Sequence, residues 1–509
     1  MNPGTIVLLV VQRICGSVLL AVLCWSAPHL ALAQSLTHAP DLILTGTLLG
    51  KDHQTYREDA FRVPAGVRRL TLDFSYSGKS ERTTLDIGLR DPVRFRGWSG
   101  GARSRLVVAE GLATPAYLAG PLPAGMWKLI IGVPNIRKVA RTDYTARIWF
   151  DRTGERDGDI QALPAAKGAS WYRGDLHAHT AHSDGTCLAS SGQRIPCPVF
   201  KTLEAARSRG LDFLAVTDHN TFAQNQSLTE LAPYFDTLLL IPGREITTFQ
   251  GHTNVWGPDG DLDFQLGTRR ARTTDAIFDQ AHAAQGLVSI NHPRLPSGEA
   301  CMGCGWSAAT DWSKVDAMEV INGGSLAVLG PEGPVSGIPF WEGLLDRGFR
   351  ITGVGGSDNH DPDLAADKPG ALGRPLTYVH ADALSRAGIL EGIRQGRVFL
   401  DIRGLDRARL EVRATSGEQS VEMGGVLKLQ PGAEVTLRVD VSGLPAGARL
   451  TVRGNGAGSF ANRDWGLESG HVDLKLAFSG AASWLRFDAR DAAGGLMILG
   501  NPVYLTPAP

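Results

Sequence analysis

One short segment of this 509-residue chain concentrates residues that could do chemistry. The sequence GDLHAHTAHSDGT, residues 174–186, holds three of the chain's 13 histidines together with two aspartates. A buried imidazole must find a hydrogen-bond partner or lower stability, so an apolar core has no use for three of them side by side. Imidazole and carboxylate together suit Zn²⁺, Mn²⁺ or Fe, and the segment therefore predicts a metal site.

Further residues of the same types follow strand-like apolar runs. The runs and their polar ends are FLAVTDHN with Asp218 and His219, LLLIPGRE with Glu245, HTNVWG opened by His252, GLVSINHP with His292, and ITGVGGSDNH with Asp358 and His360. His177 and His179 are spaced i, i+2, as are Asp358 and His360, so on extended backbone each pair projects from one face. Each pair could therefore reach one ion.

The candidate ligands outnumber what one tetrahedral ion can bind. They are His177, His179, Asp184, His219, Glu245, His252, His292, Asp358 and His360. The set predicts two to three divalent metal ions, Zn, Mn or Fe, as the cofactors.

The elements that must position these residues alternate between helix-like and strand-like segments over residues 170–402. VFKTLEAARSRGL precedes FLAVTDHN, TTDAIFDQAHAAQ precedes GLVSINHP, and DALSRAGILEGIRQG follows the last motif. About seven such units predict an α/β domain with parallel strands closed into a barrel, whose chemistry collects at the carboxyl ends of the strands.

The flanking regions have a different pattern, and a chain of this length should form more than one domain. Residues 40–152 and 403–509 carry short alternating runs such as RRLTLDFSYS and AEVTLRVDVSG, separated by Gly, Pro and Asp. This alternation predicts an N-terminal and a C-terminal β-sandwich.

The first 33 residues have the pattern of an export signal. Arg13 precedes an apolar stretch, and Ala31-Leu32-Ala33 forms an A-x-A cleavage pattern before Gln34. The stretch is too short to span a bilayer, and no transmembrane segment is expected after its removal. The sequence predicts a periplasmic or secreted protein.

Four cysteines remain after that cleavage: Cys187, Cys197, Cys301 and Cys304. In an oxidising compartment four cysteines predict two disulfides, with three possible connectivities. The shortest loops pair Cys187 with Cys197 and Cys301 with Cys304. The alternative for CMGC, residues 301–304, is half of a zinc site or a redox pair.

Composition and charge narrow the functional classes. With 43% hydrophobic and 20% charged residues the chain is an ordinary globular protein, and the formal net charge is −1. It has no long run of Lys or Arg, which argues against a broad nucleic-acid footprint.

The motifs HAHTAHSDG, TDHN, GRE, NHP and SDNH, in this order, resemble those of the PHP (polymerase and histidinol phosphatase) superfamily of metallohydrolases over residues 172–402. The closest resemblance is to the CehA/McbA-like branch, some of whose members hydrolyse carbamate esters. The resemblance implies a distorted (βα)7 PHP-type barrel that holds two or three metal ions.

The resemblance also implies three ligand sets, and the position of Asp184 departs from the usual histidine of the third. The implied sets are His177, His179, Glu245 and Asp358; Glu245, His252 and His292; and Asp184, His219 and His360.

A water on such ions would be acidified to a pKa near about 7 and serve as the nucleophile. The predicted substrate is a small-molecule phosphoester, and carboxyl or carbamate esters are the alternative substrates. A further alternative is that the chain is a catalytically inert binding protein whose β-sandwiches bind a polymer or a surface. The predicted catalytic residues are Asp218, Glu245, Asp358 and Arg374. Asp218 is expected to orient His219 or a water, and Arg244, Arg294 or Arg374 to pair with phosphate oxygens.

Two loops that carry cysteines leave strand ends that carry ligands, so they are expected at the mouth of the pocket. Trp306, just beyond CMGC, is predicted to give that mouth an apolar wall. His282, within a helix-like run, is expected on a helix surface, and His182 either beside the ligands or on the rim.

Overall fold

A computed structural model describes residues 39–152, 168–258, 260–298, 301–405, 407–460, 463–467 and 469–509. The predicted signal peptide, residues 1–33, lies outside these ranges. Among the helices of the described ranges, none combines the length and hydrophobicity needed to cross a bilayer.

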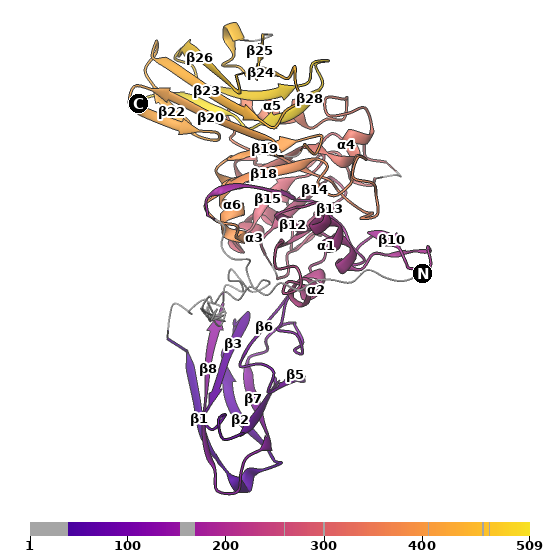
Figure 1. Cartoon of the computed structure of the whole chain (residues 1–509), viewed down its shortest axis with the longest axis vertical. Helices are drawn as coiled ribbons and strands as arrows, with labels where there is room; N and C mark the ends of the chain where they lie inside the picture. Colours follow the sequence, from indigo (N-terminus) through magenta and orange to yellow (C-terminus); the bar gives the residue numbers. More distant parts are fainter. Residues whose placement is uncertain are drawn as a thin grey trace, which may run out of the picture. The chain divides into compact units, whose positions relative to one another are not determined.

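Residues 42–151 form two four-stranded antiparallel sheets, ordered β1-β8-β3-β6 and β2-β7-β4-β5 (Figure 1). Their strands are β1 (Leu42–Leu49), β2 (Tyr56–Val63), β3 (Arg69–Tyr76), β4 (Thr84–Arg90), β5 (Phe95–Gly100), β6 (Arg105–Ala109), β7 (Gly125–Asn135) and β8 (Arg141–Asp151), with a short 3-10 turn at Gly50–Asp52. Alternate residues such as Leu70, Leu72 and Ile148 are buried in one hydrophobic core. The period-two pattern of the sequence therefore produces the sandwich-like arrangement that it predicts.

The central region is a mixed sheet with helices. Its elements are β9 (Ser170–Asp175), β10 (Thr186–Leu188), β11 (Arg194–Pro196), α1 (Val199–Ser208), β12 (Phe213–Val216), α2 (Gln224–Leu231), β13 (Leu239–Thr248), β14 (Gly251–Trp256), α3 (Thr274–Ala283), β15 (Leu287–Ile290), a 3-10 turn at Trp312–Lys314, β16 (Ala317–Asn322), α4 (Gly323–Ala327), α5 (Ile338–Asp346), β17 (Thr352–Gly356), β18 (Leu376–Ala381), α6 (Arg386–Arg394) and β19 (Val398–Asp401). Side-chain caps start three of the helices: Thr273 accepts from Ala276 N–H before α3, Asn322 from Gly324 N–H before α4, and Ser385 from Gly388 N–H before α6.

The sheet does not show the distorted (βα)7 barrel that is expected from the sequence. Strands run in the order β17-β16-β15-β14-β13-β12-β9-β18-β19, and only β9-β12, β12-β13, β15-β16 and β16-β17 pair in parallel. β13 and β14 form an antiparallel hairpin, and β18 runs antiparallel to β9. The described residues contain six α-helices, so several strand connections lack the helix that a regular βα unit would place there.

Side-chain hydrogen bonds join β17, the first strand of this path, to β18, and join the end of β9 to the segment after β17. Thr377 Oγ1, on β18, donates to Gly355 O at 2.8 Å and accepts from Gly355 N–H at 3.0 Å, on β17. The buried Asp175 carboxylate at the end of β9 accepts from Ser357 N–H at 3.0 Å and Gly373 N–H at 2.7 Å. These bonds hold the strand ends that carry the candidate ligands close together.

The C-terminal strands form a second sandwich-like pair of sheets, one of which continues the central sheet. The strands are β20 (Arg409–Ser416), β21 (Gln419–Glu422), β22 (Val426–Leu429), β23 (Glu434–Ser442), β24 (Arg449–Arg453), β25 (Asp464–Gly466), β26 (His471–Ala477), β27 (Ser483–Arg490), β28 (Leu496–Gly500) and β29 (Val503–Pro507), with a 3-10 turn at Gly458–Phe460. β28 pairs antiparallel with β19, so one hydrogen-bonded sheet crosses the predicted boundary at residue 402. Buried Asn501 adds side-chain bonds to Gly353 and to Val398 O.

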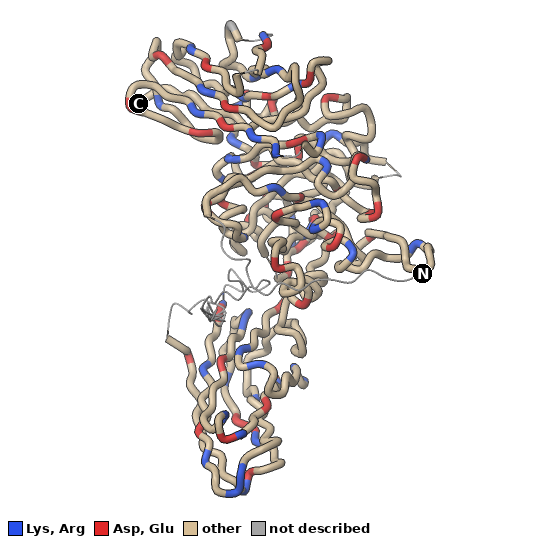
Figure 2. Tube along the Cα trace, in the orientation of Figure 1, with Lys and Arg blue, Asp and Glu red and all other residues tan. Residues whose placement is uncertain are grey.

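Basic and acidic residues are interspersed along the described trace (Figure 2). On the β20-β23-β26 surface they form cross-strand pairs, such as Lys475 with Glu434 at 2.9 Å and Arg438 with Asp473 at 3.7 Å. Exposed pairs of this kind contribute at most about 1 kcal/mol each.

Candidate metal centre

The candidate ligands gather on the segments that follow strands of the central sheet. His177 and His179 follow β9, His219 follows β12, and His292 follows β15. Glu245 and His252 lie on the two strands of the β13-β14 hairpin. The structure therefore brings together residues that are up to about 180 positions apart in sequence, as His179 and Asp358 are.

Glu245 is the centre of the group. Its carboxylate is 1% exposed and lies within 3.6 Å of a nitrogen of five histidines. The distances are 3.4 Å to His177 Nε2, 3.6 Å to His179 Nε2, 2.8 Å to His219 Nδ1, 3.4 Å to His252 Nδ1 and 3.2 Å to His292 Nε2. A carboxylate with two oxygens in this position can bridge two ions.

Asp358 faces the same space from the loop after β17. Its Oδ1 lies 3.3 Å from His177 Nε2 and 3.1 Å from His179 Nε2. These three residues form one group whose ligand atoms are close enough to share an ion. The i, i+2 spacing thus does place both histidines beside the same carboxylate.

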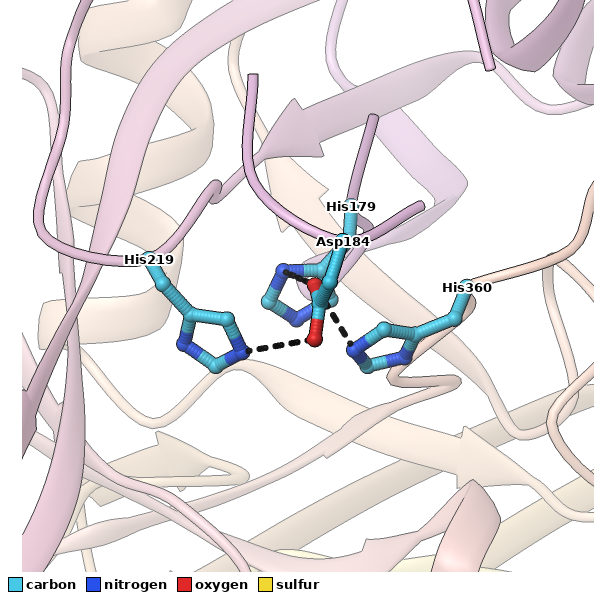
Figure 3. Close-up of side chains that lie close together, drawn as sticks. All are labelled: His179, Asp184, His219 and His360. Carbon is cyan, nitrogen blue, oxygen red and sulfur yellow. Dashed lines mark ion pairs between the residues drawn. The ribbon is translucent and has the colours of Figure 1, made fainter. Parts of the chain in front are cut away.

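A second group is more open to solvent: His179, Asp184, His219 and His360 (Figure 3). Asp184 Oδ1 lies 3.3 Å from His360 Nε2 and 3.8 Å from His179 Nδ1, and Oδ2 lies 3.7 Å from His219 Nε2. The side chains of Asp184, His360 and His219 are 57%, 38% and 27% exposed. His179 faces both groups, which joins the open group to the buried one.

The third group contains a residue that was not among the predicted ligands. His252, His292 and Cys304 place one ligand atom each within 4.8 Å of one another, and all three residues are buried. Cys304 arrives from the loop after β15, where it is bonded to Cys301.

Neighbouring groups fix the orientation of several rings. Glu319 Oε1 lies 2.7 Å from His177 Nδ1, and Met302 O lies 3.1 Å from His252 Nε2. When one ring nitrogen donates to such an acceptor, the other is left with a free lone pair. The free nitrogens are then His177 Nε2 and His252 Nδ1, the ones that face Glu245.

Asp218 does not contact His219 in the predicted way. Its carboxylate accepts from Thr180 N–H at 2.7 Å, Thr180 Oγ1 at 2.7 Å and Ser183 Oγ at 2.6 Å. Ser183 Oγ also lies 3.3 Å from His179 Nδ1. Asp218 therefore shapes the loop that carries His179 and Asp184.

Sequence reasoning missed two buried polar residues of the centre. Besides its bond to His177, Glu319 accepts from His292 N–H at 3.2 Å, and Asn291 Nδ2 donates to Glu245 Oε1 at 2.8 Å. The available signal for Glu319 was an acid inside the strand AMEVIN, whose six residues are all buried. A carboxylate in such a strand must be paired, and that requirement points to a site.

The electrostatics of the centre are dominated by burial and by mutual attraction. Burial raises the pKa of Glu245, but His177, His219 and His252 more than offset it and hold that pKa well below its usual range. Burial likewise lowers the pKa of His177, but Glu319, Asp358 and Glu245 raise it well above normal. For His360, Asp184 and Asp358 outweigh burial and raise the pKa to about 9. The residues thus form a tightly coupled set of opposite charges.

The donor set fits divalent metal ions. His177 Nε2 and His292 Nδ1 are buried and make no hydrogen bond within the described residues, which is costly unless another partner is bound. Asp358 and His292 also have positive φ values, 54° and 27°, a strained conformation that persists when the surroundings impose it. Carboxylate, imidazole and strained backbone together are typical of a metal centre.

The three arginines that were predicted to pair with phosphate oxygens have other contacts in the structure. Arg244 is buried, donates to Gly260 O and lies over the ring of Phe222. Arg294 is exposed and its Nη2 lies 3.5 Å from Pro334 O. Arg374 lines a separate cavity of about 410 Å³ with Arg403 and Leu496, and none of the residues lining that cavity is a candidate ligand. The structure does not bring Arg374 to the centre as a catalytic residue.

The cysteines pair as the shortest loops predict, with Cα–Cα distances of 4.9 Å for Cys187–Cys197 and 5.5 Å for Cys301–Cys304. Trp306 is half-buried beside Gly251, which directly precedes His252, and its role as an apolar wall stays a prediction. Its ring packs against Gly251 and lies 6.3 Å from Phe278 and 6.5 Å from Trp312, and its Nε1 donates to Thr310 Oγ1.

The two remaining histidines lie outside the centre. His182 is exposed on the loop before Asp184. His282 lies on α3 with its side chain 34% exposed, so the expected helix-surface position is confirmed, and it pairs with Asp316 at 2.9 Å.

No protein-family model and no curated protein matches the chain. Among solved structures, it is similar to a two-domain protein of Bacteroides vulgatus that contains a predicted PHP-like metal-dependent phosphoesterase, with 18% identity over 69% of this chain and 99% of that chain and a TM-score of 0.36. A β-glucuronidase of Bacteroides uniformis gives 8% identity, 89% and 74% coverage and a TM-score of 0.19. Both TM-scores are low, so neither similarity establishes a function for this chain.

Proposed function

We propose that the chain is an exported PHP-type metal-dependent hydrolase that cleaves phosphoesters of small molecules. The observation that carries the proposal is Glu245, a buried carboxylate within 3.6 Å of five histidine nitrogens. Two or three divalent ions would be held by the three groups that surround it. When bound, such ions supply Lewis acidity and lower the pKa of a water to near about 7.

The chain's own residues divide the remaining work. Glu245 and Asp358 supply the negative charge that holds cations, and Glu319 orients His177. Asp218, through Ser183, positions His179. The exposed side of Asp184, His219 and His360 is where a substrate can approach. Of the remaining ligands, Asp358 is 19% exposed and the others are at most 5% exposed.

A metal-depletion experiment tests the proposal. Chelator-treated protein should lose hydrolysis of p-nitrophenyl phosphate and bis-p-nitrophenyl phosphate, and Zn²⁺, Mn²⁺ or Fe²⁺ should restore it. Elemental analysis of active protein should give two to three equivalents of metal per chain. Activity that survives complete metal removal, or one equivalent or fewer in active protein, would contradict the proposal.

Carboxyl or carbamate ester hydrolysis is the second candidate, and the rim of the centre favours it. Phe249 and Met302 are 95% and 73% exposed, and Gly303, beside both, packs against His252. Two exposed apolar side chains at this place suit an apolar leaving group. Faster turnover of 1-naphthyl N-methylcarbamate than of the phosphoesters by the same metal-loaded protein would select this candidate.

A further inference from the structure

The Cys301–Cys304 disulfide lies against the metal centre. Cys304 is fully buried, and its Sγ falls within 4.8 Å of ligand nitrogens of His252 and His292. The backbone between the two cysteines also contacts the centre, because Met302 O lies 3.1 Å from His252 Nε2. The sulfur therefore has two imidazoles as neighbours, and both imidazoles also face the Glu245 carboxylate, at 3.4 Å from His252 and 3.2 Å from His292.

We propose that the Cys301–Cys304 disulfide conceals a metal ligand, and that its reduction delivers the Cys304 thiolate to the ion held by His252, His292 and Glu245. The inference rests on the proposed metal centre and adds a redox control to it. A disulfide sulfur is a poor ligand, whereas a thiolate binds Zn²⁺ strongly. These residues would then supply two imidazoles, one carboxylate and one thiolate, donors of the kinds that bind Zn²⁺.

A buried partner supports this assignment independently of the cysteine. His292 Nδ1 is buried and makes no hydrogen bond within the described residues, while its Nε2 faces Glu245 at 3.2 Å. A buried ring nitrogen without a partner is costly unless another group binds there, so His292 has one nitrogen beside Glu245 and a second that still needs a partner. His252 Nδ1 also faces Glu245, since its Nε2 lies beside Met302 O.

The two sulfurs differ in accessibility, and this difference decides which sulfur a reductant attacks. Cys301 is half-buried, whereas Cys304 is fully buried. One thiolate of a dithiol reductant would attack Cys301 Sγ and form a mixed disulfide with it. The Cys301–Cys304 bond breaks in this step, and Cys304 leaves as the thiolate. The second thiol of the reductant then releases Cys301 as a thiol and leaves as a cyclic disulfide. Two electrons pass from the dithiol to the protein, and the Cys304 thiolate is the group stabilised by a cation.

Single cysteine variants separate this proposal from a purely structural disulfide. Cys301→Ser leaves Cys304 as a permanent thiol, and Cys304→Ser leaves Cys301 instead. Cobalt-substituted Cys301→Ser should show near-ultraviolet thiolate-to-cobalt charge-transfer absorption that Cys304→Ser and the oxidised wild type lack. In chelator competition, Cys301→Ser should hold its most tightly bound ion about tenfold or more strongly than Cys304→Ser, because a thiolate replaces a hydroxyl.

Wild-type protein provides a test that does not depend on a variant folding. After treatment with dithiothreitol and desalting, its cobalt form should gain the same absorption, and reoxidation should remove it. Cys187→Ser, which frees the Cys197 thiol outside the three candidate groups, is the matched control and should show no such band. Identical spectra for Cys301→Ser and Cys304→Ser, or no change on reduction of wild type, would overturn the proposal. Since the absorption needs no turnover, it can succeed or fail independently of the hydrolase proposal.

Discussion

The two sides of the candidate centre differ in burial and in the kind of support they receive. The buried side, with Glu245, His177 and His292, is at most 2% exposed and is bonded to Glu319 and Asn291. The open side, with Asp184, is 57% exposed at its carboxylate. The ligand side chains of the buried side are therefore held in fixed orientations by their hydrogen bonds. The ligand side chains of the open side can exchange partners with solvent. Variants on each side should therefore fail in different ways.

The largest effect is expected from Glu245→Gln, which removes the charge at the point where the groups meet. Activity should fall by about a thousandfold or more, a loss of about 4 kcal/mol of transition-state stabilisation, and metal content should fall by at least one equivalent. Kinetics and elemental analysis check this. Glu204→Gln, which loses only an exposed partner of Lys201, is the control and should match wild type. Retention of wild-type metal content would break the comparison.

Asp184→Asn should affect the open side alone. We expect one equivalent of metal to bind weakly or be lost and activity to drop by about ten- to a hundredfold, since metal ligands tune affinity by such factors. Metal titration followed by calorimetry resolves the sites. The exposed Asp367→Asn provides the matched control. If all equivalents were lost together, the two sides would not be separable.

Glu319→Gln should weaken the buried side without removing a ligand. The amide oxygen can still accept from His177, so the ring keeps its orientation while the negative charge behind it is lost. Metal affinity should fall by about tenfold to a hundredfold, with the open-side equivalent unchanged. If the metal affinity of the open side fell instead, the prediction that Glu319 acts on the buried side would be wrong.

The smallest effect concerns a carboxylate that belongs to neither side. Burial raises the pKa of Asp401 to about 6, against bonds from Arg403 N–H and Gly404 N–H. Between pH 3.9, about the ordinary pKa, and pH 6, the Asp401 carboxyl is therefore mostly protonated in the folded protein and mostly ionised in the unfolded chain. Stability from this group increases as the pH falls through that window and is lost as it rises.

Urea unfolding of wild type and Asp401→Asn checks the sign. As the pH falls from 7 to 4.5, the free energy of unfolding of wild type should rise relative to that of the variant by about 2 kcal/mol. Metal content should be the same in both proteins. An unchanged difference across the range would show that the carboxylate stays ionised.

The ligand motifs were predictable because each of them lies at or just beyond an apolar run that forms a buried strand. The residues that orient them were harder to predict: Glu319 lies inside a strand, and its role depends on a partner 142 positions away. The hairpin of β13 and β14 departed from the βα repeat because the segment between them is a short turn with no room for a helix. The catalytic role predicted for Arg374 failed because a residue that is close to a motif in sequence need not direct its side chain to the same site.

The sheet that runs from β17 through β19 into β28 has a consequence for how the protein is made. Asn501 bonds to Gly353 on β17, 148 positions earlier in the chain and beside the loop that carries Asp358. The ribosome must therefore synthesise residue 501 before the strands around the centre acquire these neighbours. The C-terminal strands therefore join the central sheet late, and a shortened chain that ends at residue 402 should be cut by proteases faster than the full chain.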